Sequence, residues 1–393
     1  MENKFDLPEP SAEARDHSHS LTALIRERID DSGGWIDFAE YMSLALYAPG
    51  LGYYSAGSQK FGPAGDFVTA PEISPLFSRC LARSVGDVLQ ALDGGVVMEI
   101  GAGTGAMAAE ILRVLDRADR LPESYLILEV SADLRERQYQ EIEQRVPHQL
   151  DRVVWLETLP EPGIDGVILA NEVMDALPVN CFCTNGDEVL VLGVSYASEN
   201  LCWKQVPASG ELLQAVLEIR EDIGGDFPDA YRSEICPVLP AWISSIASAL
   251  NRGLIMLVDY GLPRRHLYHP DRAEGSLICH YRHRAHNDPF FYPGLQDISA
   301  WVDFTAVAQS AGRNGLTVAG YTTQAHYLLD AGVEEELTES LDDDPERQLR
   351  TAAQLKTLML PGEMGERFKV MGLSRQFEDI GAGFGGRDLR HTL

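Results

Sequence analysis

Between residues 96 and 171 the sequence alternates short apolar runs with segments of helical periodicity. Four runs have the length and composition of buried strands, namely 96–100, 124–130, 153–157 and 165–171. Helical sequence follows the first two, ending near Arg117 and Arg145. Strands that are apolar on both faces and alternate with helices of about 10–15 residues are typical of a parallel sheet covered on both sides. This region therefore predicts a doubly wound α/β domain.

The regions on either side of this alternation carry other patterns. Residues 1–95 combine helical stretches with a Gly/Pro/Tyr-rich segment from Ala48 to Ser74, and we expect this N-terminal region to cover the active site. The core, 96–261, includes a further buried strand near its end. Within it, alternating apolar residues and an Asn-Gly turn predict an inserted antiparallel segment at about 179–235. Residues 262–300 read as an insertion loop, and 301–393 as the helices and strands that complete the sheet, followed by a flexible tail.

The charge balance excludes some functional classes. With 32 Lys+Arg against 60 Asp+Glu, the chain carries a formal charge of −28 at pH 7. Nucleic-acid binding depends on clustered cations, so we expect no nucleic-acid partner. We find no run of the roughly 20 apolar residues that a membrane span requires. The first residues lack the pattern of a secretory signal and include acids that disfavour a mitochondrial presequence, so we expect a cytoplasmic protein.

A glycine-rich motif follows the first buried strand directly. In Glu99-Ile-Gly101-Ala102-Gly103-Thr-Gly105 the glycines stand where a strand ends and a helix begins. Glycine permits positive φ and lets a ligand approach the backbone, while the helix N-terminus offers free N–H groups. The motif also satisfies the dinucleotide fingerprint GxGxxG/A. A nicotinamide or flavin cofactor, or a purely structural turn, therefore remains an alternative to S-adenosylmethionine (SAM).

Glu99 favours SAM, whereas the acid that ends the second strand would serve either cofactor class. Glu129 ends the second strand, where an acid can hold ribose hydroxyls, and Val130 follows it. Glu99 precedes the first glycine by two residues, and its carboxylate can face the cationic amino group of SAM. Asn171 ends the fourth strand, where we expect it to border the cofactor, and Glu157 ends the third, either near the adenine or as a surface acid.

The sequence also resembles the MidA family of SAM-dependent methyltransferases. The matching segments are GYYS (52–55), GDFVTAPEISPLF (65–77), EIGAGTG (99–105), LILEVS (126–131), NEVMDALPV (171–179), VDYG (258–261), PGLQDISAWVDFT (293–305), GYTTQAHYLL (320–329) and PGEMGERFKVMGLSR (361–375). The resemblance implies a seven-stranded, Rossmann-like class I methyltransferase sheet with an N-terminal helical region and inserted substrate-side subdomains. It also implies SAM as cofactor and methylation of an arginine on a respiratory complex I subunit. Ala70 and Trp301 replace the Ser and His that are common in the family.

Methylation of an arginine requires carboxylates, because the guanidinium is protonated and is a poor nucleophile. Carboxylates can hold it by bidentate hydrogen bonds and accept its proton. Glu172 and Asp175 lie three residues apart after the fourth strand, and one helical turn would make them neighbours. Asp66 and Glu72 form a second candidate pair. The alternatives are that Asp175 caps a short helix, that Glu172 is solvated, and that the second pair only fixes a loop.

Other features are weaker candidates. Five histidines fall between His266 and His286, but their spacing matches no known ligand pattern, and we expect no metal site. Six scattered cysteines read as reduced core residues rather than ligands or disulfides. Tyr53, Tyr54 and Phe67 either line an acceptor channel or serve packing. We expect a protein substrate and a homodimer. The remaining alternatives are methylation of a small molecule or of another side chain, and a SAM-binding assembly factor with little turnover.

Overall fold

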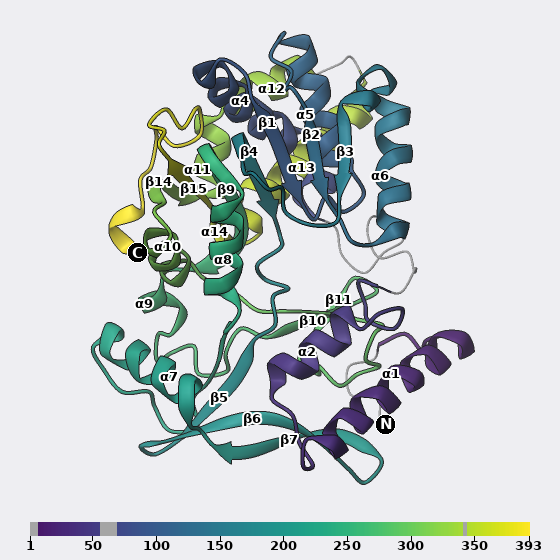
Figure 1. Ribbon diagram of the computed structural model, residues 1–393, viewed down its shortest axis with the longest axis vertical. Helices are drawn as coiled ribbons and strands as arrows, with labels where there is room; N and C mark the ends of the chain where they lie inside the picture. The colour runs from purple at the N-terminus through teal and green to yellow at the C-terminus, as the bar shows by residue number, and fades with distance from the viewer. Residues whose placement is uncertain (1–6, 56–68, 341–343) are drawn as a thin grey trace. The chain divides into compact units, whose positions relative to one another are not determined.

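The computed structural model describes residues 7–55, 69–340 and 344–393. The chain divides into two compact units, each built from three segments (Figure 1). Unit 1 comprises Met1–Phe67, Met174–Leu239 and Pro263–Asp303. Unit 2 comprises Val68–Val173, Pro240–Leu262 and Phe304–Leu393.

Unit 2 contains a seven-stranded sheet. Its strands are β1 (Val96–Ile100), β2 (Tyr125–Leu128), β3 (Val153–Leu156), β4 (Ile164–Asn171), β9 (Leu250–Leu262), β14 (Thr317–Thr323) and β15 (Phe368–Arg375). They pair in the order β14-β15-β9-β4-β1-β2-β3. The pairs from β9 to β3 are parallel, whereas β15 runs antiparallel to both of its neighbours. The predicted seven-stranded class I methyltransferase fold is confirmed.

Helices surround this sheet. They are α3 (Ala70–Ile73), α4 (Pro75–Leu92), α5 (Ala106–Arg117), α6 (Ala132–Arg145), α8 (Leu239–Ser248), α10 (Phe304–Arg313), α11 (Gln324–Asp330), α12 (Val333–Ser340), α13 (Pro345–Met359) and α14 (Met364–Arg367), with short 3-10 turns η1 (Pro147–Arg152) and η2 (Arg390–Thr392). Side chains define several starts: Ser131 accepts from Leu134 N at α6, and Ser74 accepts from Leu76 N at α4. Although α3 and α4 precede residue 95, they belong to unit 2.

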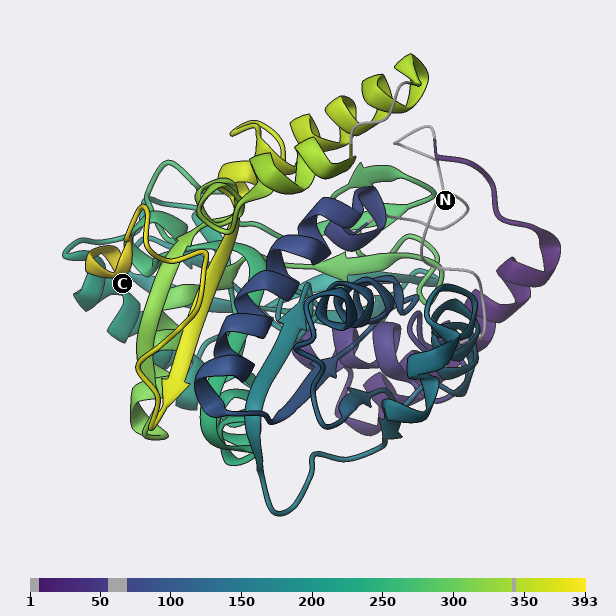
Figure 2. The same cartoon turned by 90° about the horizontal axis from the view of Figure 1, so that it is seen from above.

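The core of unit 2 explains why its strands read as continuous apolar runs. Val97 and Val167 on one face of the sheet pack in a buried cluster with helices α4 and α5. Met98 and Ile168, one residue further along each strand, point to the opposite face and are also fully buried. Helix α4 packs on β4 (Figure 2), and α10 packs on β9 and β14. Both faces are thus covered, as parallel sheets require.

The C-terminal segment is held against unit 2, so the prediction of a flexible tail is wrong. Gly383 N and Gly385 N donate to the carboxylate of Asp330 at 3.0 and 2.7 Å. The ring of Phe384 packs edge-on against Tyr327, with 5.4 Å between ring centroids. Leu389 N donates to the carbonyl of Tyr321 on β14 at 2.8 Å. The glycines provide the backbone N–H groups and the low bulk that this close packing needs.

Unit 1 contains two antiparallel sheets. The first has the order β7-β6-β5-β8 and comprises β5 (Asn180–Asn185), β6 (Glu188–Ala197), β7 (Asn200–Pro207) and β8 (Arg232–Ile235). The second has the order β11-β10-β12 and comprises β10 (Ile278–Tyr281), β11 (Arg284–His286) and β12 (Asp297–Ser299). The unit also holds α1 (Ala12–Asp31), α2 (Phe38–Tyr47), α7 (Gly210–Ile223), α9 (Arg264–Leu267) and β13 (Val302–Asp303). The region predicted as an insertion loop therefore contains regular strands.

Among the described residues, no group of three or more His, Cys, Asp or Glu side chains is placed to hold a metal ion. The helices seen in 7–55, 69–340 and 344–393 are all too short or too polar to cross a membrane.

Candidate cofactor and acceptor site

The sheet order of unit 2 places two loops at one edge. After β1 the chain builds the sheet toward β3, and it then returns to place β4 on the other side of β1. Strands β1 and β4 pair in parallel, with Ile100 opposite Ala170. Their carboxyl ends therefore lie together, and ligands of open α/β sheets bind at such a reversal of strand order. The glycine motif leaves β1 here, and Asn171 and Glu172 end β4.

Two glycines of the motif have different surroundings. Gly105 has φ +88°, and a Cβ there would lie 2.9 Å from the Cα of Gln138, so glycine is needed for the close packing of α5 on α6. Gly103 has φ +53°, and a Cβ there would meet no atom of the described chain within 4 Å. The backbone at Gly103 thus faces open space, as a loop that receives a ligand should.

A hydrogen-bond network fixes the acid at the end of β2. The Glu129 carboxylate, 8% exposed, accepts from Ser131 N at 2.9 Å and from Gln138 Nε2 at 3.2 Å. Gln138 Nε2 also donates to the carbonyl of Gly103 at 3.1 Å, and Gln138 Oε1 accepts from Trp155 Nε1 at 2.9 Å. Burial raises the pKa of Glu129, and these donors partly offset that shift.

Gln138 is a site residue that the sequence analysis missed. It is fully buried on α6 and joins the glycine loop, the β2 acid and the β3 indole. Because these groups are distant in sequence, neither periodicity nor a motif identifies it. A glutamine at a position where the helix faces the sheet is the one signal that the sequence offers.

The residues beyond Glu129 present an apolar surface beside a charged pair. Val130 is 79% exposed, which is unusual for valine and suits contact with an adenine ring. Glu157 pairs with Arg135 at 3.2 Å, and its side chain is 77% exposed. Arg135 also donates through Nε to the carbonyl of Glu129 at 2.7 Å. Contact of Val130 or Glu157 with a cofactor stays a prediction.

Glu99 is more deeply buried than a solvated strand end. Its carboxylate is 1% exposed and accepts from the hydroxyl of Tyr125 at 2.5 Å. Burial raises the pKa of Glu99 to about 7, although the Tyr125 hydrogen bond acts in the opposite direction. A cation nearby would favour the ionised form. The predicted contact with the amino group of SAM is therefore compatible with this carboxylate, and it stays a prediction.

The end of β4 supplies a fixed carboxylate beside a buried amide. Glu172 Oε1 accepts from Ala70 N at 3.1 Å and from Asn171 Nδ2 at 3.0 Å. In the described part of the chain, the buried Oδ1 of Asn171 has no hydrogen-bond partner. Such an acceptor costs free energy unless a ligand or water provides a donor. A nucleoside cofactor with a polar amino-acid tail fits these groups, which are Asn171 Oδ1, the open backbone at Gly103 and the buried acid Glu129.

The segment after β4 differs from the sequence prediction. Glu172 has φ +53°, and no helix forms between it and Asp175, so the predicted helical turn is wrong. The left-handed residue ends β4, where Glu172 N still donates to the carbonyl of Val258 at 2.8 Å. The unit boundary falls between Val173 and Met174, which places Asp175 in unit 1 and Glu172 in unit 2.

The other predicted acids are Glu72, Asp66 and Asp175. The carboxylate of Glu72, on α3 of unit 2, accepts from Thr69 N at 3.5 Å and helps to begin that helix. Asp66, with Phe67, lies outside the described residues. Asp175 is 8% exposed, and its carbonyl accepts from Ala300 N at 3.0 Å. The structure thus joins Glu172 to α3 through Ala70.

Aromatic residues and acids gather in unit 1. The hydroxyl of Tyr54 donates to Asp297 Oδ1 at 2.9 Å, and its ring stacks on Tyr47 with 5.5 Å between centroids. Tyr53 packs edge-on against Tyr54 and is buried. Burial and the charge of Asp297 raise the pKa of Tyr54 well above its ordinary value. Tyr53 is thus a packing residue of the unit 1 core.

Comparisons with known proteins agree with this fold. A family model described as S-adenosyl-L-methionine-dependent methyltransferase matches residues 80–322. A crystal structure from Burkholderia thailandensis, bound to S-adenosyl-homocysteine, is 40% identical with a TM-score of 0.92, over 99% of this chain and all of the other. A second structure from that organism is 39% identical, with a TM-score of 0.90 and the same coverage.

Curated relatives are more distant in sequence. "Protein arginine methyltransferase NDUFAF7, mitochondrial" of Mus musculus is 28% identical over 91% of this chain and 85% of its own. The Homo sapiens protein of the same name is 27% identical over 87% of this chain and 80% of its own.

The names of these relatives contradict the expectation of a cytoplasmic protein, because they are mitochondrial. That expectation depended on the composition of residues 1–20, which does not decide the compartment. The family match, the sheet order and the glycine loop agree on the cofactor, which is SAM. The chain belongs to the MidA family of S-adenosyl-L-methionine-dependent methyltransferases.

Proposed function

We propose that this methyltransferase transfers the methyl group of SAM to an arginine side chain of a protein. The observation that carries the proposal is the carboxylate of Glu172, held by two donors where β4 ends beside the glycine loop. The relatives named protein arginine methyltransferases support it across most of the chain. The family resemblance suggests a subunit of respiratory complex I as the acceptor protein.

In this proposal the residues of unit 2 hold the nucleoside. Gly101, Ala102, Gly103 and Gly105 form the loop that receives the cofactor, in which Gly103 faces open space, and Glu129 accepts hydrogen bonds from the ribose hydroxyls. Asn171 Oδ1 gains a donor from the amino-acid part of the cofactor. SAM supplies a methyl group on a cationic sulfur that a nucleophile can displace in line. The protein chiefly aligns the acceptor nitrogen and excludes water.

Glu172 performs the acceptor chemistry in this proposal. Its carboxylate receives the guanidinium, whose positive charge is then drawn toward the hydrogen-bonded nitrogens. The remaining nitrogen keeps more electron density and attacks the methyl carbon, and its proton passes to a carboxylate as the bond forms. The two hydrogen bonds to Oε1 fix the plane of Glu172 before the substrate arrives. We propose Asp175 as the partner acid of Glu172, and Asp66 and Glu72 as acids that close over the substrate.

Methyl transfer from radiolabelled SAM to mitochondrial extract tests the proposal. Wild-type protein should label a protein band, and acid hydrolysis of that band should release methylarginine. The Glu172→Gln variant should label it about 100-fold more slowly, because it lacks the charge that holds the guanidinium and accepts its proton. Glu27→Gln, an exposed position on α1, is the matched control and should keep wild-type activity.

Three outcomes would contradict the proposal. Label found only in small molecules would make the acceptor a metabolite. Label on a protein residue other than arginine would assign another side chain. Binding of SAM without any transfer would favour an assembly factor with little turnover.

A further inference from the structure

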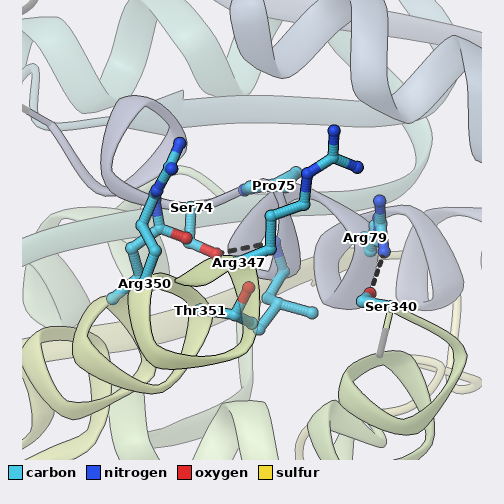
Figure 3. Close-up of a pocket in the computed structure, with 9 residues that line it drawn as sticks. Ser74, Pro75, Arg79, Ser340, Arg347, Arg350 and Thr351 are labelled. Carbon is cyan, nitrogen blue, oxygen red and sulfur yellow. Dashed lines mark hydrogen bonds between the residues drawn. The ribbon is translucent and has the colours of Figure 1, made fainter. Parts of the chain in front are cut away.

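A cavity of about 390 Å³ lies within unit 2, and none of its lining residues belongs to the glycine loop or to the acids proposed for the reaction. Its walls come from the start of α4, the end of α12 and one face of α13 (Figure 3). The lining residues are Ser74, Pro75, Leu76, Arg79, Ser340, Arg347, Arg350, Thr351 and Gln354. This volume falls in the lower part of the range of about 300–1,000 Å³ that is common for small-molecule pockets.

The charge of this cavity is opposite to that of the protein. Three of its lining residues are arginines, and among the described residues that line it there is no aspartate or glutamate. The whole chain has almost twice as many acidic as basic residues, 60 against 32. A cluster of cations without lining carboxylates is therefore unexpected for this composition. It would favour an anion electrostatically.

Acids outside the cavity hold two of the arginines. Arg79 Nε pairs with Glu110 at 2.6 Å, and Glu110 also pairs with Arg113. Arg347 Nε lies 3.4 Å from Asp344 at the start of α13. Arg350 lies one turn after Arg347 on the same helix face. Three guanidinium groups thus line the cavity, and the carboxylates of Glu110 and Asp344 are not part of that lining.

Hydroxyl groups complete the lining. Ser340 Oγ accepts from Arg79 Nη1 at 2.5 Å, which positions that guanidinium at the cavity (Figure 3). Thr351 stands beside Arg350 on α13, and Ser74 caps α4. Pro75 has no N–H group, and Leu76 N donates to Ser74 Oγ at 3.3 Å. The binding groups are thus side chains, to which the dipole of the 18-residue helix α4 adds a favourable field.

We propose that this cavity binds the phosphate group of a small phosphorylated molecule. Planar guanidinium groups match the oxygens of a phosphate in pairs, and the hydroxyls of Ser74 and Thr351 can donate to the remaining oxygen, whereas that of Ser340 donates to the carbonyl of Glu336. The cavity is larger than one phosphate, so the ligand carries an organic part as well. The proposal does not depend on the methyl acceptor, because no lining residue takes part in the proposed reaction.

Isothermal titration calorimetry in phosphate-free buffer of constant ionic strength tests the site. The probes are inorganic phosphate, ribose 5-phosphate, ribose and a short glutamate peptide. Wild-type protein should bind both phosphate compounds saturably, with ribose 5-phosphate at least as tight as inorganic phosphate, and should bind neither ribose nor the peptide. The double variant Arg347→Gln/Arg350→Gln should weaken phosphate binding at least about tenfold, because it loses two charged donors. Both positions are exposed, so this variant should remain folded.

The matched control is the double variant Arg117→Gln/Arg313→Gln. It removes the same charge from exposed positions on α5 and α10 and should change the Kd less than about twofold, by screened long-range attraction alone. An equal loss of phosphate affinity in both double variants, or no loss in either, would contradict binding at this cavity. The proposal also fails if inorganic phosphate does not bind saturably. If inorganic phosphate binds more tightly than ribose 5-phosphate, the ligand is not a phosphorylated organic molecule. Binding of ribose or of the peptide to this site would also contradict the proposed ligand class.

Discussion

At the scale of single residues, two glycines of one motif should respond differently to alanine. Gly105→Ala places a methyl group 2.9 Å from the Cα of Gln138 at φ +88°, so the backbone must shift. We expect it to lower the free energy of unfolding by about 2–4 kcal/mol. Gly103→Ala meets no neighbour and should cost about 1 kcal/mol, from its positive φ alone.

Urea unfolding and titration with S-adenosylhomocysteine measure both effects. Gly103→Ala should weaken cofactor binding more than stability, because its methyl group enters the space that we assign to the ligand. Equal stabilities of the two variants would contradict this description of the loop, and unchanged cofactor affinity of Gly103→Ala would place the ligand elsewhere.

Glu99 should make stability depend on pH. Its pKa is about 7 in the folded protein, against an ordinary value of 4.5. The unfolded chain loses this proton at lower pH than the folded protein does, so the contribution of Glu99 to stability falls as pH rises through this window. The difference corresponds to about 3 kcal/mol at most. Glu99→Gln lacks this titration, so its stability relative to wild type should increase between about pH 5 and pH 8.

Urea unfolding of wild type, Glu99→Gln and the exposed control Glu27→Gln at several pH values measures this difference. Only the Glu99 variant should depart from the wild-type profile. Parallel profiles for all three proteins would show that Glu99 titrates normally.

At the scale of elements, the C-terminal segment should contribute to the stability of unit 2. Phe384 packs on Tyr327 and lies directly over Gly320 and Gly372 of the β14–β15 pair. Phe384→Ala should lower the free energy of unfolding by about 2–3 kcal/mol, less than a fully buried phenylalanine would cost. Leu349→Ala, at a position 74% exposed, should change it by less than about 0.5 kcal/mol. Similar values for both variants in urea unfolding would mean that the segment is not docked.

The sequence predicts the first strand of the parallel sheet to the residue, since the run 96–100 coincides with β1. The glycine motif identified the β1–α5 junction because its residues carry a local requirement, positive φ at a strand end. The helical turn after β4 was wrong for the opposite reason. Glu172 adopts a left-handed conformation without a glycine to signal it, and its backbone is held by Val258, which is distant in sequence. The role of Gln138 was missed because its partners come from three separate segments.

At the scale of the whole molecule, the family match and the strand order both support a cofactor site at the carboxyl ends of β1 and β4. The sequence could predict seven strands but not the position of β15 between β9 and β14, because nothing in a strand's own residues specifies its neighbours. The chain is strongly acidic, and the structure adds a cavity in unit 2 whose charged lining residues, among those described, are arginines.

Binding of S-adenosylhomocysteine to wild type and to Glu129→Gln, measured by isothermal titration calorimetry, tests the central claim most directly. The claim is that the β1–α5 loop receives the nucleoside and that Glu129 holds its ribose. Wild type should bind one equivalent, and Glu129→Gln should bind at least about tenfold more weakly, since a charged acceptor is lost. The exposed Glu27→Gln should bind as wild type does. Equal affinity of all three proteins, or no binding by wild type, would contradict the claim.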